Sequence, residues 1–253
     1  MLVPKRKPGG SWGRSEEAGA TGTIMDVTTE IRRGSARFAS RSPGMVTSHA
    51  FSFGEHYDPE RLRFGPMVCH DDHHLGAGKG FDTHRHSGLD IVTWVVTGRL
   101  SHRDSSGHEA VVSPGEVAVL AAGSGVEHAE HATPDGRARF VQVWLAADPD
   151  RAADDPTYAV TPVPASAAPG GGLVELVAPQ PGAVLSVARL DALETLTLPA
   201  APLVHAYVVT GALTRSSLAE PLAAGDAFLF ADEPAHEVTA AVPTELLVWT
   251  FAG

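Results

Sequence analysis

Two pairs of potential metal ligands stand out, each with one residue between its members. His84 and His86 form the first pair, and His128 and Glu130 form the second. Successive side chains of a β-strand point to opposite faces, so both members of each pair would share a face. On neighbouring strands, three imidazoles and one carboxylate would converge, a set that suits a divalent metal such as iron, nickel, copper or zinc. The spacing therefore predicts a metal centre.

The residues around these pairs show a pattern that is typical of short β-strands. β-branched and aromatic residues recur in runs separated by glycine, proline and aspartate turns, and helical periodicity is nearly absent. The clearest predicted strands are Leu89 to Thr97, Ala110 to Val112, Val117 to Leu120 and Ala138 to Leu145. The sequence predicts an all-β fold in which strand ends carry the metal ligands.

One pattern occurs twice along the chain. The matching positions are the Val-Val-Thr-Gly runs at 95–98 and 208–211, the glycine turns at Gly115 and Gly225, and the histidines His128 and His236. Such a repeat indicates two β-domains of one design. The positions equivalent to His84 and His86 are Thr197 and Pro199. We therefore expect the second copy to lack the metal ligands and to serve packing, pocket closure or partner binding.

Composition and turn residues suggest where these units begin and end. Residues 1–24 are polar and aperiodic, which predicts a disordered extension. The first copy is expected over residues 25–147, a proline-rich linker over 148–181, and the second copy over 182–253.

Charge and cysteine content exclude several classes of protein. A single cysteine among 253 residues permits neither an intramolecular disulfide nor a cysteine-based metal cluster. The net charge of −11 argues against direct binding to nucleic acid or to an anionic membrane. No run of 18 apolar residues and no export signal is evident, so we expect a cytoplasmic location without a membrane span.

The first half also resembles a known family. Its spacing of Gly78, His84, His86, Asp90 and Gly98 is similar to the first metal motif of the cupins. More specifically, residues 84–90, 102–107 and 122–130 resemble the HPHRGFE, HxDSxG and AGxGxxHxE segments of the pirin family. The resemblance covers residues 26 to 146. It departs at Arg85 and Ser87, where the family has proline and arginine.

The resemblance implies two cupin domains, that is, jelly-roll-like β-barrels, in tandem. It implies that His84, His86, His128 and Glu130 hold one iron with open positions for substrate or oxygen; nickel, cobalt, manganese, copper and zinc are alternatives. Asp90 stands where cupins commonly have a glutamate ligand. We expect it to lie outside the ligand set and to orient a histidine.

Three functions are compatible with these implications. The first is a flavonol dioxygenase of the quercetinase type, which takes a flavonol and O2, uses Glu130 to accept the 3-hydroxyl proton, and releases carbon monoxide. The second is a redox-sensitive regulator that acts through a protein partner. The third is a metal-stabilised cupin with another substrate. Fold and ligand set do not fix a substrate, so all three stay open at this point.

Overall fold

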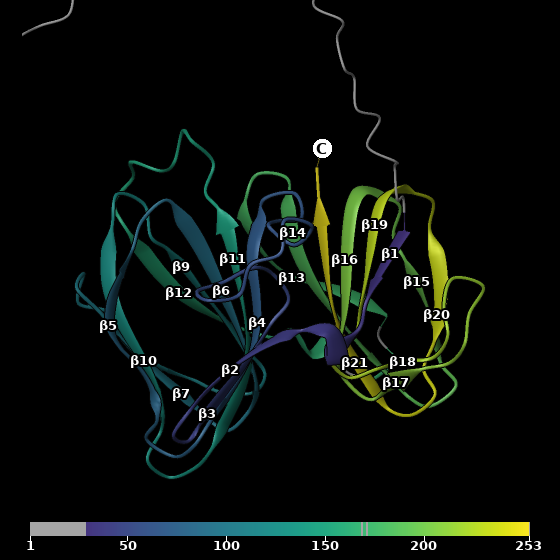
Figure 1. The fold of residues 1–253 in the computed structure, drawn as a ribbon, viewed down its shortest axis with the longest axis horizontal. Helices are drawn as coiled ribbons and strands as arrows, with labels where there is room; N and C mark the ends of the chain where they lie inside the picture. The colour runs from purple at the N-terminus through teal and green to yellow at the C-terminus, as the bar shows by residue number, and fades with distance from the viewer. Residues whose placement is uncertain (1–28, 168, 171, 253) are drawn as a thin grey trace, which may run out of the picture.

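Strands make up nearly all of the regular secondary structure in the computed structural model, which describes residues 29–167, 169–170 and 172–252 (Figure 1). The all-β prediction is confirmed. Two single turns of 3-10 helix, Gly34–Ala36 and Ala165–Ala167, are the helices of the described residues. Neither is long or apolar enough to cross a membrane. The extension expected over residues 1–24 lies outside the described part of the chain.

The strands form two groups that lie side by side (Figure 1). The first group, which we call the first barrel, contains β2 (Phe38–Ser42), β3 (Met45–His49), β4 (Met67–Leu75), β5 (Gly80–His86), β6 (Leu89–Thr97), β7 (Leu100–Asp104), β8 (Glu109–Val112), β9 (Glu116–Ala121), β10 (Val126–Ala132), β11 (Ala138–Ala146) and β12 (Thr157–Pro162). The second barrel contains β1 (Thr29–Arg32), β13 (Leu173–Gln180), β14 (Ala183–Leu190), β15 (Thr195–Leu198), β16 (Ala201–Thr210), β17 (Ala212–Leu213), β18 (Leu222–Ala223), β19 (Ala227–Glu233), β20 (His236–Thr239) and β21 (Thr244–Phe251).

Both barrels are built to one plan. A large sheet in the order β12-β9-β6-β11-β4-β3-β2 faces the smaller sheet β5-β10-β7-β8 in the first barrel. In the second, the sheet β1-β19-β16-β21-β14-β13 is accompanied by the pairs β15-β20 and β17-β18. The order β9-β6-β11 thus recurs as β19-β16-β21. The repeated glycines Gly98 and Gly211 follow β6 and β16 with positive φ, and a Cβ at either would collide with a backbone carbonyl. The repeat seen in the sequence is therefore a repeat of structure.

The two large sheets pack against each other and share a core. On β6, Val92 and Trp94 face the second barrel, whereas Ile91 and Val95 face the interior of their own barrel. The same alternation holds in β16, where Tyr207 and Val209 join the shared core. The central part of each large sheet is thus buried on both faces, which explains why β6 and β16 carry apolar residues on both of their faces.

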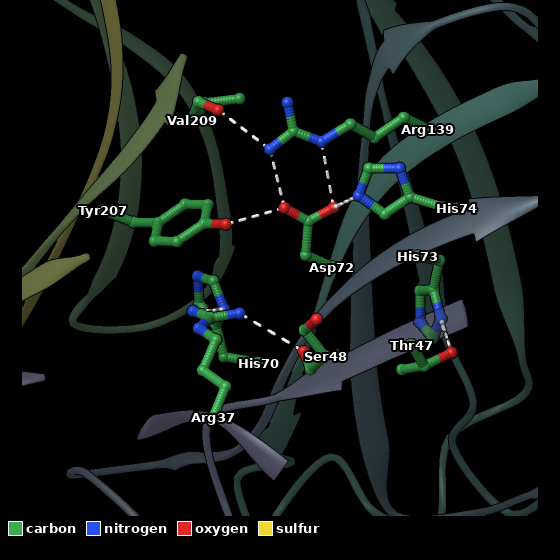
Figure 2. A network of polar contacts seen from close by, with 10 residues as sticks. All are labelled: Arg37, Thr47, Ser48, His70, Asp72, His73, His74, Arg139, Tyr207 and Val209. Atoms are coloured by element: carbon green, nitrogen blue, oxygen red, sulfur yellow. Dashed lines mark hydrogen bonds and ion pairs between the residues drawn. The ribbon is translucent and has the colours of Figure 1, made fainter. Parts of the chain in front are cut away.

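Polar contacts tie the barrels together at one end of this core (Figure 2). The carboxylate of Asp72 accepts hydrogen bonds from Arg139 at 3.1 and 2.7 Å and from the hydroxyl of Tyr207 at 2.7 Å. Arg139 also donates to the carbonyl of Val209 at 2.8 Å. Burial alone would raise the pKa of Asp72, but these donors hold it below its ordinary value. Asp72 is therefore an ionised anchor between the barrels.

The observed boundaries differ from the expected ones. Strand β1, expected in the first copy, pairs with β19 in the second barrel. The expected linker contains two edge strands: β12 pairs with β9 in the first barrel, and β13 pairs with β14 in the second. Proline is compatible with edge strands because it need not donate a ladder hydrogen bond there. Pro162 ends β12 and Pro179 lies at an irregularity of β13, so these prolines do not mark a linker.

Candidate metal centre

Strands β5 and β10 bring the two predicted ligand pairs together. They are antiparallel neighbours, and His84 lies directly opposite His128 while His86 lies opposite Val126. Residues opposite each other in an antiparallel pair project to the same face. The three histidines therefore converge on one side of the β5-β10 pair, inside the first barrel.

The three imidazoles are in mutual contact. The Nε2 atoms of His84 and His128 are 3.1 Å apart, and the ring centroids of His86 lie 4.8 and 5.0 Å from those of His84 and His128. His84 Nδ1 donates to the carbonyl of Asp82 at 2.7 Å, which directs its Nε2 toward the other histidines. His86 Nε2 is buried with no hydrogen-bond partner among the described residues. This nitrogen has a lone pair that protein groups do not use.

The arrangement fits a metal ion. One ligand nitrogen from each histidine lies within 4.8 Å of the other two. Two nitrogens that are each about 2.1 Å from a common ion lie about 3 Å apart when they subtend a right angle. Burial first, and then repulsion by neighbouring imidazoles, lowers the pKa of His128 to about 3 and that of His86 to about 4. Both are therefore neutral at pH 7, as metal ligands must be.

Glu130 projects from the same face of β10 as His128. Its carboxylate is buried, and its Oε2 accepts a hydrogen bond of 2.8 Å from Gln142 on β11. Burial raises the pKa of Glu130 to about 7, although the bond from Gln142 opposes the shift. A register irregularity between His128 and Glu130 places Glu130 opposite Phe81 instead of Asp82. The potential ligand atoms of Glu130, His128 and His102 lie within 4.8 Å of one another. His128 also belongs to the group formed with His84 and His86, so it is common to both groups.

His102 is a neighbour of the site that the spacing of the ligand pairs does not reveal. It lies opposite Glu130 on β7, is buried, and stacks on Tyr158 with ring centroids 3.8 Å apart. Its Nε2 contacts Asp104 at 3.1 Å, while its Nδ1 is buried without a partner among the described residues. The sequence signal is the HxD pair at 102–104, but only the pairing of β7 with β10 brings it to Glu130.

Asp90 does not orient a histidine. On β6 it has the same parity as Val92 and Trp94, so it points away from the interior of the first barrel. Its carboxylate accepts a 3.3 Å hydrogen bond from Arg151 instead. The expectation for Asp90 was wrong because the alternation along the strand places it on the opposite face from the ligands.

A cavity of about 450 Å³ opens beside the ligand cluster. Glu130 and His84 lie on one side of it, and Phe53, Phe81 and Trp144 make much of its wall apolar. Larger hollows of about 640 and 570 Å³ lie on other faces and are more open to solvent. This less open, aromatic cavity is the one that a small molecule could occupy in contact with the cluster.

The equivalent position in the second barrel has a different environment. His236 Nε2 contacts Glu233 at 3.1 Å and its ring lies 4.9 Å from that of Phe230. Both groups of potential metal ligands found in the described residues lie in the first barrel.

Comparisons with known proteins agree with this arrangement. Residues 31–145 match the sequence profile of the Pirin family. A Mycobacterium bovis protein named "Putative quercetin 2,3-dioxygenase" is 35% identical over 237 residues, which are 89% of this chain and 96% of the relative. The quercetin 2,3-dioxygenase of Escherichia coli K12 is 32% identical over 116 residues, 46% of this chain and 50% of that protein.

Among solved structures, the bacterial pirin YhhW from Escherichia coli in complex with nickel(II) is similar to the whole described fold. It has a TM-score of 0.79 and 25% identity, and the match covers 88% of this chain and 99% of that one. The profile match covers the strands that carry the ligand cluster, and the structural match extends over both barrels. The chain belongs to the pirin family.

Proposed function

We propose that this chain is a metal-dependent flavonol dioxygenase of the quercetin 2,3-dioxygenase type. The observation that carries the proposal is the aromatic cavity of about 450 Å³, which has both His84 and Glu130 in its wall. A planar, hydroxylated aromatic compound could pack against Phe53, Phe81 and Trp144 while one of its oxygens meets the ligand cluster. The names of the relatives support the same class of substrate.

The metal would be held by His84, His86, His128 and Glu130. Iron(II) is our first candidate, and nickel, cobalt, manganese, copper and zinc suit the same donors. Nickel(II) is the ion named for the similar Escherichia coli pirin. When bound, the metal supplies Lewis acidity toward an oxygen of the substrate.

The protein groups around the metal have separate roles in this proposal. Glu130 accepts the proton of the flavonol 3-hydroxyl, since its buried carboxylate lines the cavity and lies among the potential metal ligands. Gln142 holds the Glu130 carboxylate, and Trp144 Nε1 fixes Gln142 through a 2.9 Å hydrogen bond to its Oε1. Dioxygen then opens the central ring of the deprotonated flavonol with loss of carbon monoxide.

Turnover of quercetin by the metal-loaded protein tests this function. Chelator-stripped protein is loaded with one equivalent of iron(II), mixed with quercetin in air, and followed by the loss of quercetin absorbance and by trapping of carbon monoxide. We expect metal-dependent turnover that is lost in His84→Ala. If neither iron nor any of the other five metals supports turnover of quercetin or other flavonols, the proposal fails, and metal binding without turnover would favour the regulatory alternative.

A further inference from the structure

A second group of residues, of the kinds that enzymes use in catalysis, lies in the wall of the same cavity. His49 Nδ1 is 2.8 Å from the Oδ2 atom of Asp71, and His49 Nε2 is 2.9 Å from the hydroxyl oxygen of Ser40. His49 and Asp71 are only 3% and 4% exposed, whereas Ser40 is accessible to solvent. All three line the cavity that contains Glu130 and His84. The metal centre does not use any of them.

Strand register places these residues on one face. His49 on β3 lies opposite Asp71 on β4, and Ser40 on β2 lies opposite Thr47, two residues before His49. Ser40, Thr47, His49 and Asp71 therefore all project into the first barrel. Asp71 lies opposite Gln142, and Gln142 lies opposite Thr93, so the polar row continues across the sheet. Gln142 also donates a hydrogen bond to Glu130, which connects this row to the ligand cluster.

The hydrogen bonds define a direction for proton transfer. An ionised carboxylate can only accept, so Nδ1 of His49 donates to Asp71. In the neutral imidazole the Nε2 atom then carries a lone pair and accepts from the Ser40 hydroxyl. Ser, His and Asp in this order form the arrangement that activates a serine nucleophile, and it recurs on unrelated folds.

We propose that Ser40, His49 and Asp71 form an acyl-transfer site that hydrolyses aryl esters in this cavity. The wall beside the site is aromatic, since Phe53 stacks on His49 at 5.2 Å between ring centroids and meets Trp144 edge-on at 5.6 Å. Such a wall suits an ester whose acyl or leaving group is an aromatic ring.

The proposed reaction consumes only the ester and water. Ser40 Oγ bonds to the acyl carbon and gives its proton to His49 Nε2. The carbon–oxygen bond to the phenol then breaks, and the phenol oxygen takes that proton. A water molecule next attacks the acyl-serine, again giving a proton to His49, and releases the carboxylic acid while Ser40 regains its proton.

A source for such an ester follows from the proposed function, on which this assignment of substrate rests. Removal of a flavonol ring carbon as carbon monoxide leaves the former ring oxygen bonded to a new acyl carbon, which makes an aryl ester. Hydrolysis in the same cavity would convert this ester into two smaller aromatic products without its release to another enzyme.

Hydrolysis of a chromogenic aryl ester tests the site without any flavonol. Full-length protein, as purified and after removal of metal by a chelator, is assayed with 4-nitrophenyl benzoate and labelled with a fluorophosphonate probe. We expect an adduct on Ser40 by peptide mass spectrometry. We also expect at least about a 100-fold loss of hydrolysis in Ser40→Ala and His49→Ala, the size of a general-base contribution. The rate should not depend on the metal.

Ser48→Ala is the matched control. Ser48 is on β3 next to His49, lies opposite Ala39, and lines a different hollow on the other face of the sheet. Its substitution should leave both the adduct and the rate unchanged. Absence of a Ser40 adduct, a rate in Ser40→Ala equal to that in Ser48→Ala, or hydrolysis that disappears with the metal would overturn the proposal. None of these outcomes depends on whether the protein cleaves flavonols.

Discussion

The closest contact in the ligand cluster joins two nitrogens, His84 Nε2 and His128 Nε2, at 3.1 Å. His84 already donates through Nδ1 to a backbone carbonyl, so its Nε2 presents a lone pair. Neutral His128 can meet this lone pair in the metal-free protein by carrying its one proton on Nε2, which leaves its buried Nδ1 without a partner among the described residues. A metal ion that binds the folded cluster and not the unfolded chain stabilises the fold, so we expect the protein to be more stable with metal than without it.

Substitution of single residues should therefore show that the first barrel binds the metal and the second does not. His84→Ala and Glu130→Ala are each expected to reduce bound metal from one equivalent per chain to nearly none. Loss of a hydrogen-bond partner outside the ligand shell alone can cost about 10- to 100-fold in affinity, and loss of a ligand costs more. His236→Ala should keep full occupancy. Elemental analysis of the three variants provides the measurement, and metal retained by His84→Ala would contradict the ligand assignment.

At this scale the sequence predicts that the three histidines converge but does not predict their neighbours. An HxH spacing fixes side-chain direction within one strand, so the convergence of His84, His86 and His128 could be anticipated. His102, Ser40 and Asp71 come from other strands. Their positions around the histidines and the cavity depend on which strands pair and in what register, and no local pattern encodes that information.

Among the elements, the β5-β10 pair determines whether the ligands meet. Gly80, the first residue of β5, lies very close to the backbone of β10, since a Cβ at this position would be 2.1 Å from the carbonyl oxygen of Glu130. That oxygen belongs to the backbone of β10, so it cannot move aside alone. Only glycine allows β5 to lie at its observed distance from β10 here.

Gly80→Ala should consequently weaken metal binding although it changes no ligand. We expect β5 to shift away from β10, with at least about a 10-fold loss of metal affinity, comparable to the loss of a positioning contact. Gly136→Ala is the matched control, because a Cβ at Gly136 meets nothing within 4 Å and its φ is not in the left-handed region. Metal titration followed calorimetrically compares the two, and equal affinities would contradict this role of Gly80.

Strands could be predicted from the sequence more reliably than their membership in a barrel. The predicted strand Leu89 to Thr97 coincides with β6, and the Ala138 to Leu145 prediction differs from β11 by one residue. In contrast, the span interpreted as a linker contains β12 and β13. Proline is typical of irregular chain and is also accepted by edge strands, so its presence does not distinguish a linker from the edge of a sheet.

For the whole molecule, the contact between the barrels is both apolar and ionic. Asp72 and Arg139 have side chains that are 7% and 19% exposed, and Tyr207 completes the group from the second barrel. Since hydrogen bonds depress the folded-state pKa of Asp72, its ionised form stabilises the fold. That contribution is complete above the unfolded pKa of about 3.9 and is lost as the pH falls through the folded value.

Asp72→Asn should lower the free energy of unfolding by about 2 to 3 kcal/mol at pH 7, a cost reduced by the partial exposure of Arg139. The difference in free energy of unfolding between this variant and the unsubstituted protein should shrink in acid, where Asp72 becomes protonated and is then neutral like asparagine. Urea unfolding at pH 7 and near pH 3 measures both values. Asp135→Asn, at an exposed ion pair with Arg99, is the control and should leave the midpoint nearly unchanged. A difference that grew in acid would contradict the assignment.

The pairing of β1 with β19 has a consequence for synthesis of the protein. Residues 29–32 leave the ribosome early, but their partner strand, Ala227–Glu233, is made almost 200 residues later. At roughly 5 to 20 residues per second, that delay is about 10 to 40 seconds. The first barrel contains all of its own strands by Pro162 and can close during translation. The nascent chain must meanwhile keep β1 unpaired, because its partner strand is made only after the whole first barrel.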